Sequence, residues 1–133
     1  MNELKVFMKN KNSFQNSNVL VLGAGISGRA CAKWLVKNDS RVTLVDTRKL
    51  DIPIRKYKNL TVKTGVDFSE TAENVENFEF IIPSASLSPY KKNKLNISNI
   101  LKSAKNKGIK IRTEVDLFEM ALRLTNYEKK YQN

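Results

Sequence analysis

Three closely spaced glycines are the residues of this sequence best placed to bind a charged ligand. Gly23, Gly25 and Gly28 lie in the hexapeptide GAGISG (23–28), and the whole chain has five glycines. We expect Gly23 to allow a tight turn, Gly25 to let backbone N–H groups approach a phosphate, and Gly28 to let a helix pack closely against a sheet. An anion would then lie at the start of that helix, where unpaired N–H groups and the helix dipole favour negative charge.

A second set of polar residues follows the apolar run at 42–45. Asp46 ends this run, and Thr47 and Arg48 come next. An acidic residue at the tip of the second strand of a βαβ unit can meet the ribose or the base of a nucleotide. The spacing GxGxxG also occurs in tight turns between a strand and a helix that bind nothing, so that interpretation stays open.

The composition excludes several kinds of chemistry. The chain has one cysteine and no histidine among its 133 residues, so no disulfide can form within it and no imidazole can act as a base or a ligand. We therefore predict no catalytic residue and no metal site in this chain. Cys31 follows the glycines on the predicted helix, and we expect a small buried apolar side chain there rather than a reactive thiol.

The charge of the chain is strongly positive. The 24 lysines and arginines outnumber 13 acidic residues and give a net charge of +11, which is typical of nucleic-acid-binding proteins. The lysines are scattered among asparagines instead of gathering with aromatic residues, so we predict no nucleic-acid partner. No apolar run approaches the length of a membrane span, and the first residues carry no signal-peptide pattern. We expect a soluble, cytoplasmic monomer with no membrane partner.

A strand before the glycines and a helix after them must position the loop. The apolar run 19–22 predicts the strand, and the segment 26–37 predicts the amphipathic helix. Further strands are predicted at 41–46, 60–64, 78–82 and 109–112, with helical segments at 68–77 and around 97–107. This alternation indicates an α/β, Rossmann-like three-layer fold with a five-stranded parallel sheet in the order 3-2-1-4-5 and helices on both faces.

A final helix is predicted after the fifth strand. Thr113 should cap it, with Asp116 at the third helical position. Its apolar face is predicted to consist of Val115, Phe118, Ala121 and Leu122. At the other end of the chain, we expect Phe14 to pack against the first strand.

Ligands of such sheets bind at the carboxyl ends of the strands, where the strand order reverses. Two loops should meet at this point. The glycine loop 23–28 and the serine-rich loop 84–88 are expected to face each other across a crevice. Residues 46–48 would close one end of it.

Four segments give a more specific resemblance. They are VLVLGAGISGRACAKWL (19–35), VTLVDTR (42–48), FIIPSAS (80–86) and GIKIRTEVDLFEMAL (108–122). In combination they resemble the N-terminal domain of the MurD-type Mur ligases, which add D-glutamate to UDP-N-acetylmuramoyl-L-alanine in peptidoglycan (cell-wall) biosynthesis. The resemblance implies a loose arm over 1–17, a UDP-substrate-binding domain over 18–124, and a linker over 125–133 to a missing central ATPase domain.

The resemblance also implies roles for individual residues. Backbone amides of Ile26 and Ser27, with the three residues 46–48, would contact the uracil end of the substrate. Ser84 and Ser86, in the loop after the fourth strand, would approach the sugar and the diphosphate. The family usually has Ser-Pro-Gly in this loop, and Ser86 stands where the family has the glycine.

Mur ligases resemble one another in a central ATPase domain, where a Walker-type loop and Mg²⁺ act on ATP, and in a third domain for the incoming amino acid. No G-x-x-x-x-G-K-[ST] motif occurs in this chain. We therefore expect a fragment or truncated product that binds substrate, holds no cofactor of its own and is inactive alone. The alternative is an NAD(P)-binding domain of an oxidoreductase or a regulatory protein, in which Asp46 would bind the ribose. Arg48 counts against that alternative.

Overall fold

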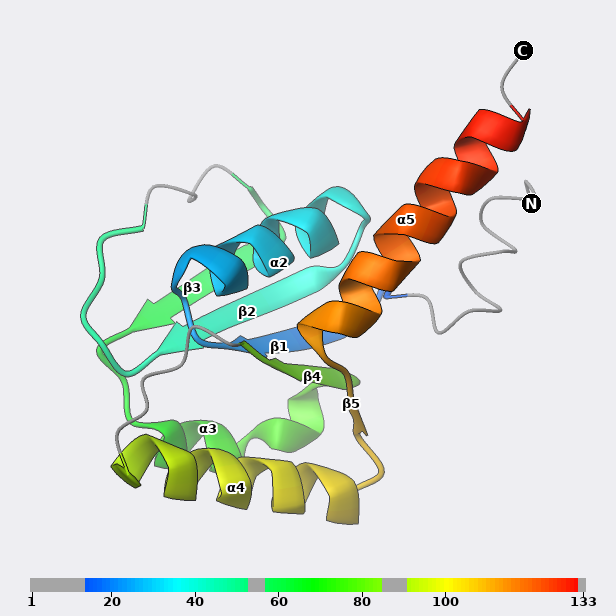
Figure 1. Ribbon diagram of the computed structural model, residues 1–133. Helices are drawn as coiled ribbons and strands as arrows, with labels where there is room; N and C mark the ends of the chain where they lie inside the picture. Colours follow the sequence, from blue (N-terminus) through cyan, green and yellow to red (C-terminus); the bar gives the residue numbers. More distant parts are fainter. Residues whose placement is uncertain (1–13, 53–56, 85–90, 132–133) are drawn as a thin grey trace.

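The computed structural model describes residues 14–52, 57–84 and 91–131. Its centre is a five-stranded parallel sheet in the order β3-β2-β1-β4-β5 (Figure 1). The strands are β1 (Asn18–Leu22), β2 (Arg41–Asp46), β3 (Leu60–Thr64), β4 (Phe80–Pro83) and β5 (Lys110–Ile111). The helices are α2 (Ile26–Lys37), α3 (Phe68–Glu73), a short 3₁₀ turn (Val75–Asn77), α4 (Lys91–Asn106) and α5 (Glu114–Tyr131). The predicted fold class and strand order are confirmed.

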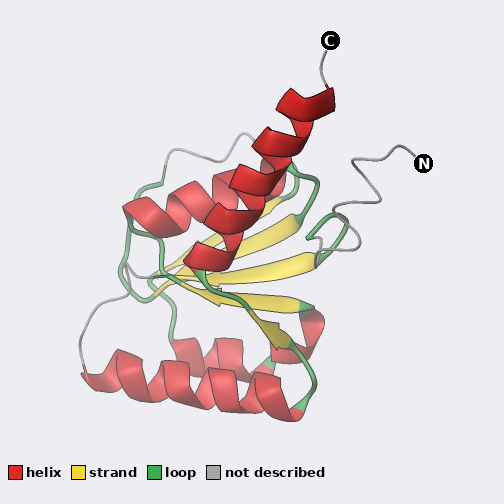
Figure 2. Cartoon of the chain, turned by 45° about the vertical axis from the view of Figure 1, so that its right-hand side comes forward, coloured by secondary structure: helices red, strands yellow, loops and turns green. Residues whose placement is uncertain are grey.

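Helices cover both faces of the sheet. α2 and α5 lie on one face, and α3 and α4 lie on the other (Figures 1 and 2). The side chains of β1 alternate between the two faces: Val19 and Val21 belong to the apolar cluster under α2 and α5, and Leu20 and Leu22 belong to the cluster over α3 and α4. Because β1 is covered on both faces, its sequence is apolar without interruption.

The edge strand β3 has a different pattern. Leu60 and Val62 pack against the cluster on the α2 side. Thr61 and Lys63 alternate with them and are exposed. Because successive side chains of a strand point to opposite faces, the α3 side of the sheet is polar at this edge.

Phe14, where the described part of the N-terminal arm begins, belongs to the core. Phe14 is 1% exposed, and its ring centroid lies 4.6 Å from that of Phe80 on β4. The hydroxyl of Ser40 donates to the carbonyl oxygen of Phe14 at 2.6 Å. The predicted burial of Phe14 is confirmed, and the ring contact that the structure shows is with β4.

The predicted apolar face of α5 is wrong. Val115, Phe118 and Leu122 are 72%, 66% and 49% exposed, and Ala121 is half-buried. The buried face consists of Leu117, Met120 and Leu124, which pack into the same cluster as Phe14 and Phe80. Both sets of residues have helical spacing, so periodicity alone cannot distinguish the stripe that meets the sheet. The exposed stripe borders a groove of about 430 Å³ that it shares with Trp34 and Cys31 of α2.

The ends of α5 are also informative. Thr113 and Asp116 form the predicted cap, with Thr113 N donating to Asp116 Oδ2 at 2.8 Å and Asp116 N donating to Thr113 Oγ1 at 3.1 Å. The helix continues to Tyr131, so residues 125–131 are helical, while the division of the chain into 1–17, 18–124 and 125–133 stays a prediction.

No helix within the described ranges is both long and apolar enough to cross a membrane.

Candidate functional site

The glycine loop leaves β1 through a left-handed turn. Gly23 has a φ of 105°, which glycine adopts without the strain that a Cβ would cause, and its N–H donates to the carbonyl oxygen of Val45 at 2.7 Å. A Cβ on Gly28 would lie 1.8 Å from the carbonyl oxygen of Gly23 and 3.2 Å from Ser84 Oγ. Gly28 therefore lets α2 pack closely, and the surface it packs against is the loop itself together with Ser84.

The start of α2 has no side-chain cap. Gly25 precedes the helix with φ −75° and ψ −163°, an extended conformation open to other residues, and as a glycine it has no side chain that could accept from the first turn. At the start of α3, in contrast, Asp67 Oδ1 accepts from Ser69 N at 2.9 Å. The N-cap residue therefore supplies no side-chain acceptor to the first N–H groups of α2, at Ile26 and Ser27, which lie at the positive end of the helix dipole.

Asp46 lies behind the loop and is nearly enclosed, with 3% of its surface exposed. Its Oδ2 accepts from Ala24 N at 2.8 Å and from Arg48 Nη2 at 2.9 Å, and its Oδ1 accepts from Arg48 N at 2.8 Å and from Arg48 Nε at 3.1 Å. Burial alone would raise the pKa of this carboxyl, but the hydrogen bonds from Arg48 and Ala24 and the charge of Arg48 lower it below its ordinary value. Asp46 thus ties the glycine loop to Arg48.

Ser27 and Ser84 bring the glycine loop and the end of β4 into contact, while residues 85–88 of the predicted serine-rich loop lie outside the described residues. Their hydroxyl oxygens lie 3.1 Å apart, and Ser84 is 4% exposed. The hydroxyl of Ser27 also donates to Glu114 Oε1 of α5 at 3.3 Å. Glu114 was not among the predicted site residues, and its position directly after the cap residue Thr113 was the available signal. Ser86 lies outside the described residues.

A cavity of about 380 Å³ lies beside the glycine loop. The loop, α2 and the segment after β2 supply its lining, which consists of Ala24, Gly25, Ile26, Arg29, Arg48, Leu50, Asp51 and Ile52. Arg29 Nε donates to the carbonyl oxygen of Gly25 at 3.2 Å, so Arg29 lies against the glycine loop. Both Arg29 and Arg48 line the cavity, together with Asp51 and apolar side chains. Such a cavity suits a flat polar ring joined to a phosphate.

The residues that line the cavity differ in part from the predicted site residues. Thr47 is half-buried and is not among the residues that line the cavity. Arg29, Leu50, Asp51 and Ile52 line it without having been predicted. Arg29 follows Gly25 by one helical turn, so the predicted helix over 26–37 could have placed it next to the loop. The other three follow β2 in a segment whose path no local pattern specifies.

Cys31 lies on α2 outside this cavity. Its thiol has a pKa raised to about 11, because burial disfavours the thiolate and the nearby charge of Glu114 adds to the effect. The thiol therefore stays protonated near neutral pH. This environment supports the prediction of an unreactive side chain, but Cys31 is half-buried and not fully buried as expected.

Sequence comparison relates the chain to a group of ligases. It is 30% identical over 114 residues to the UDP-N-acetylmuramoylalanine–D-glutamate ligase of Albidiferax ferrireducens, covering 84% of this chain and 22% of that protein. It is 32% identical over 112 residues to the enzyme of the same name from Elusimicrobium minutum, covering 83% of this chain and 22% of that protein. The chain thus spans about a fifth of the length of these curated relatives. No family model matches it.

Structural comparison adds evidence on the fold. An epimerase from Methanothermobacter thermautotrophicus superposes with a TM-score of 0.60 at 21% sequence identity, covering 83% of this chain and 37% of that chain. At this identity the likeness shows a shared Rossmann-like fold and carries no information on the ligand.

Proposed function

Since this chain is a MurD-like domain, related in sequence to the UDP-N-acetylmuramoylalanine–D-glutamate ligases, we propose that it binds the uridine diphosphate part of UDP-N-acetylmuramoyl-L-alanine. The observation that carries the proposal is the cavity beside the glycine loop, lined by two arginines and by the uncapped start of α2. It lies at the carboxyl ends of β1 and β2, where sheets of this class bind nucleotides.

The diphosphate would lie at the start of α2. The backbone N–H groups of Ile26 and Ser27 would donate to its oxygens, and Arg29, one turn further along the helix, would add positive charge. Gly25 would allow the close approach because it has no Cβ. Ser84, which lies within hydrogen-bond distance of Ser27, would bind the sugar side of the ligand.

The uracil would lie between the loop and the segment after β2. Leu50 and Ile52 would provide apolar contact, and the guanidinium of Arg48 would stack on the ring or donate to its carbonyl oxygens. Asp46 already accepts four hydrogen bonds from Ala24 and Arg48. We therefore assign Asp46 the role of holding the loop and Arg48 in place.

Within a ligase, this domain would present the nucleotide substrate to other parts of the enzyme. ATP and Mg²⁺ would act there, because the chain contains no Walker motif to hold the phosphates of ATP. By itself the chain would bind substrate without ligating D-glutamate to it. Such a ligase would serve peptidoglycan synthesis in the cytoplasm.

Thermal melts with UDP, NAD and NADP at matched concentration and ionic strength test the proposal. Ligand at ten times its dissociation constant should stabilise the fold by about 1.4 kcal/mol, which is a rise in Tm of roughly 3–8 °C for a domain of this size. We expect this rise with UDP, and only the smaller effect of phosphate charge with NAD and NADP. Gly25→Val should abolish the UDP effect, while the α4 variant Lys102→Gln, which changes charge far from the loop, should keep it. A larger shift with NAD than with UDP would contradict the proposal.

A further inference from the structure

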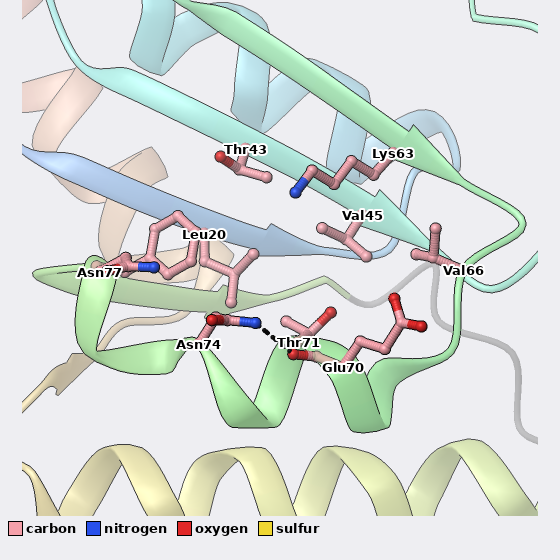
Figure 3. A pocket seen from close by; sticks show the side chains of 10 residues that line it. Leu20, Thr43, Val45, Lys63, Val66, Glu70, Thr71, Asn74 and Asn77 are labelled. Atoms are coloured by element: carbon pink, nitrogen blue, oxygen red, sulfur yellow. Dashed lines mark hydrogen bonds between the residues drawn. The ribbon is translucent and has the colours of Figure 1, made fainter.

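A second cavity lies on the opposite face of the sheet, between β1, β2 and β3 on one side and α3 on the other (Figure 3). Its volume is about 330 Å³, within the range of about 300–1,000 Å³ that is typical of sites for small molecules. Its lining consists of Leu20, Thr43, Val45, Lys63, Val66, Glu70, Thr71, Asn74, Asn77 and Phe78. None of these residues lines the cavity beside the glycine loop.

The cavity exists because α3 is short and its large buried apolar side chains lie only at its ends, while between them only the small side chain of Ala72 packs against the same cluster. Phe68, at the first position of α3, and Val75, just after it, are both fully buried in the cluster on this face. Between these anchors, α3 turns Thr71 and Asn74 towards the sheet in place of large apolar side chains (Figure 3). The sheet opposite carries Lys63 from the edge strand, so this half of the face is not closed by packing.

Opposite charges lie on opposite walls of the cavity. Lys63 projects from β3 over the sheet, and Glu70 projects from α3 (Figure 3). Within the described part of the chain, neither of them forms an ion pair. A simple anion bound by Lys63 would meet the carboxylate of Glu70, and a simple cation bound by Glu70 would meet the ammonium of Lys63. The pair therefore favours a ligand that carries both charges.

The neutral groups fit the same kind of ligand. Thr43 lies beside Lys63 on the sheet wall, and Thr71 and Asn74 lie beside Glu70 on the helix wall (Figure 3). Asn74 Nδ2 donates to the carbonyl oxygen of Glu70 at 3.0 Å, which leaves the amide oxygen of Asn74 as an acceptor. Leu20 and Val45 supply the apolar side chains of its floor, and both are almost wholly buried, at 0% and 1% exposed.

We propose that this cavity binds a small zwitterion, a free amino acid with an apolar side chain. Its carboxylate would pair with Lys63 and accept from the hydroxyl of Thr43. Its ammonium would pair with Glu70 and donate to the amide oxygen of Asn74. Its side chain would lie on the apolar floor. The proposal is independent of the nucleotide site, because the two cavities share no residue and lie on different faces of the sheet.

Amide NMR spectra of the ¹⁵N-labelled chain test this proposal with leucine and two analogues that each lack one charge. Isocaproate has the carboxylate without the ammonium, and isoamylamine has the ammonium without the carboxylate. Leucine should shift the amide signals of residues around the cavity, such as Val66, Thr71 and Asn74, in a saturable way. Each analogue should bind at least about tenfold more weakly than leucine, because it leaves one charged side chain unpaired.

Variants of the two charged residues complete the test. Lys63→Gln and Glu70→Gln should each weaken leucine binding about tenfold, whereas the exposed neighbours Lys58→Gln and Glu73→Gln should leave it unchanged. The double exchange Lys63→Glu with Glu70→Lys should restore binding, because the ligand can turn end to end. The spectra of all variants report whether they fold. Equal binding of isocaproate and leucine, shifts located elsewhere, or the absence of saturable shifts in a folded chain would overturn the proposal.

Discussion

The two cavities of this domain lie on opposite faces of one sheet and differ in how their charges are satisfied. Beside the glycine loop, the carboxylate of Asp46 is buried and accepts four hydrogen bonds from Ala24 and Arg48. Beside α3, Lys63 and Glu70 lie across a cavity from each other without pairing. The charges around the first cavity are therefore paired within the protein, and a ligand there would meet backbone N–H groups and an arginine that Asp46 already orients. The second offers charges that a ligand would have to bridge.

The largest effect should come from disturbing the organised loop. Gly28→Ala places a Cβ against the carbonyl of Gly23, since the ideal position is 1.8 Å from that oxygen. The loop must move, and we expect a loss of about 3 kcal/mol in the free energy of unfolding, together with loss of the UDP-dependent rise in Tm. Urea denaturation and thermal melts measure the two effects.

Gly108→Ala provides the matched control. Gly108 has a φ of +73°, but apart from its chain neighbours no atom of the described residues lies within 4 Å of the position of its Cβ. The substitution should cost only the backbone strain of about 1–2 kcal/mol, and the UDP effect should remain. If both variants lost stability equally and both kept UDP binding, Gly28 would not be required by the packing of the loop.

A smaller effect should follow from replacing Asp46 by asparagine. The pKa of Asp46 is lowered on folding, so its stabilising contribution is fully present above the unfolded value of about 3.9 and is lost as the pH falls through the lower folded value. We expect Asp46→Asn to lower the free energy of unfolding by about 1–3 kcal/mol at neutral pH. The difference from the parent should shrink as the pH is lowered towards 3 and below. A difference that stayed constant with pH would show that the carboxylate charge is not the stabilising feature.

The smallest predicted change in stability is a gain, and it concerns the cavity on the other face of the sheet. Thr71→Leu extends an apolar side chain into the cavity under α3, and we expect a gain of about 0.5–1 kcal/mol in the free energy of unfolding, with loss of leucine binding. Thr71→Ala separates the effect of helix propensity from the effect of filling the cavity, because alanine favours the helix without occupying the cavity. The leucine variant should be the more stable of the two. Greater stability of the alanine variant would mean that the cavity does not accept apolar atoms.

The strand, glycine loop and helix around the first cavity were largely predictable because their signals are local in the sequence, while the binding of a nucleotide there stays a prediction. The glycine spacing, the apolar runs around it and the position of Asp46 lie within one βαβ unit, whose geometry varies little among proteins. The strand order follows from the alternation of strands and helices. What the local pattern could not show is the direction in which Asp46 points. It suggested a carboxylate that meets a ligand, and in the structure that carboxylate is enclosed by Ala24 and Arg48.

The features that could not be predicted depend on long-range packing. α5 has two apolar stripes, and only the position of the helix over Phe14 and Phe80 decides that Leu117 is buried and Phe118 is exposed. The contact of Ser27 with Glu114 joins residues far apart in the chain. The alternation of apolar and polar residues in β3 predicts a polar face, but the cavity opposite Lys63 depends on the length of α3.

The central position of β1 also implies an order of assembly during folding. Val19 pairs with Val42 on one side and with Phe80 on the other. Pairing with β2 closes a short loop through α2, whereas pairing with β4 closes a much longer one at a higher cost in chain entropy. The glycine loop, Asp46 and Arg48 therefore belong to a unit that can form early, and Ser84 and Glu114 join it only when the slower, non-local pairing is complete.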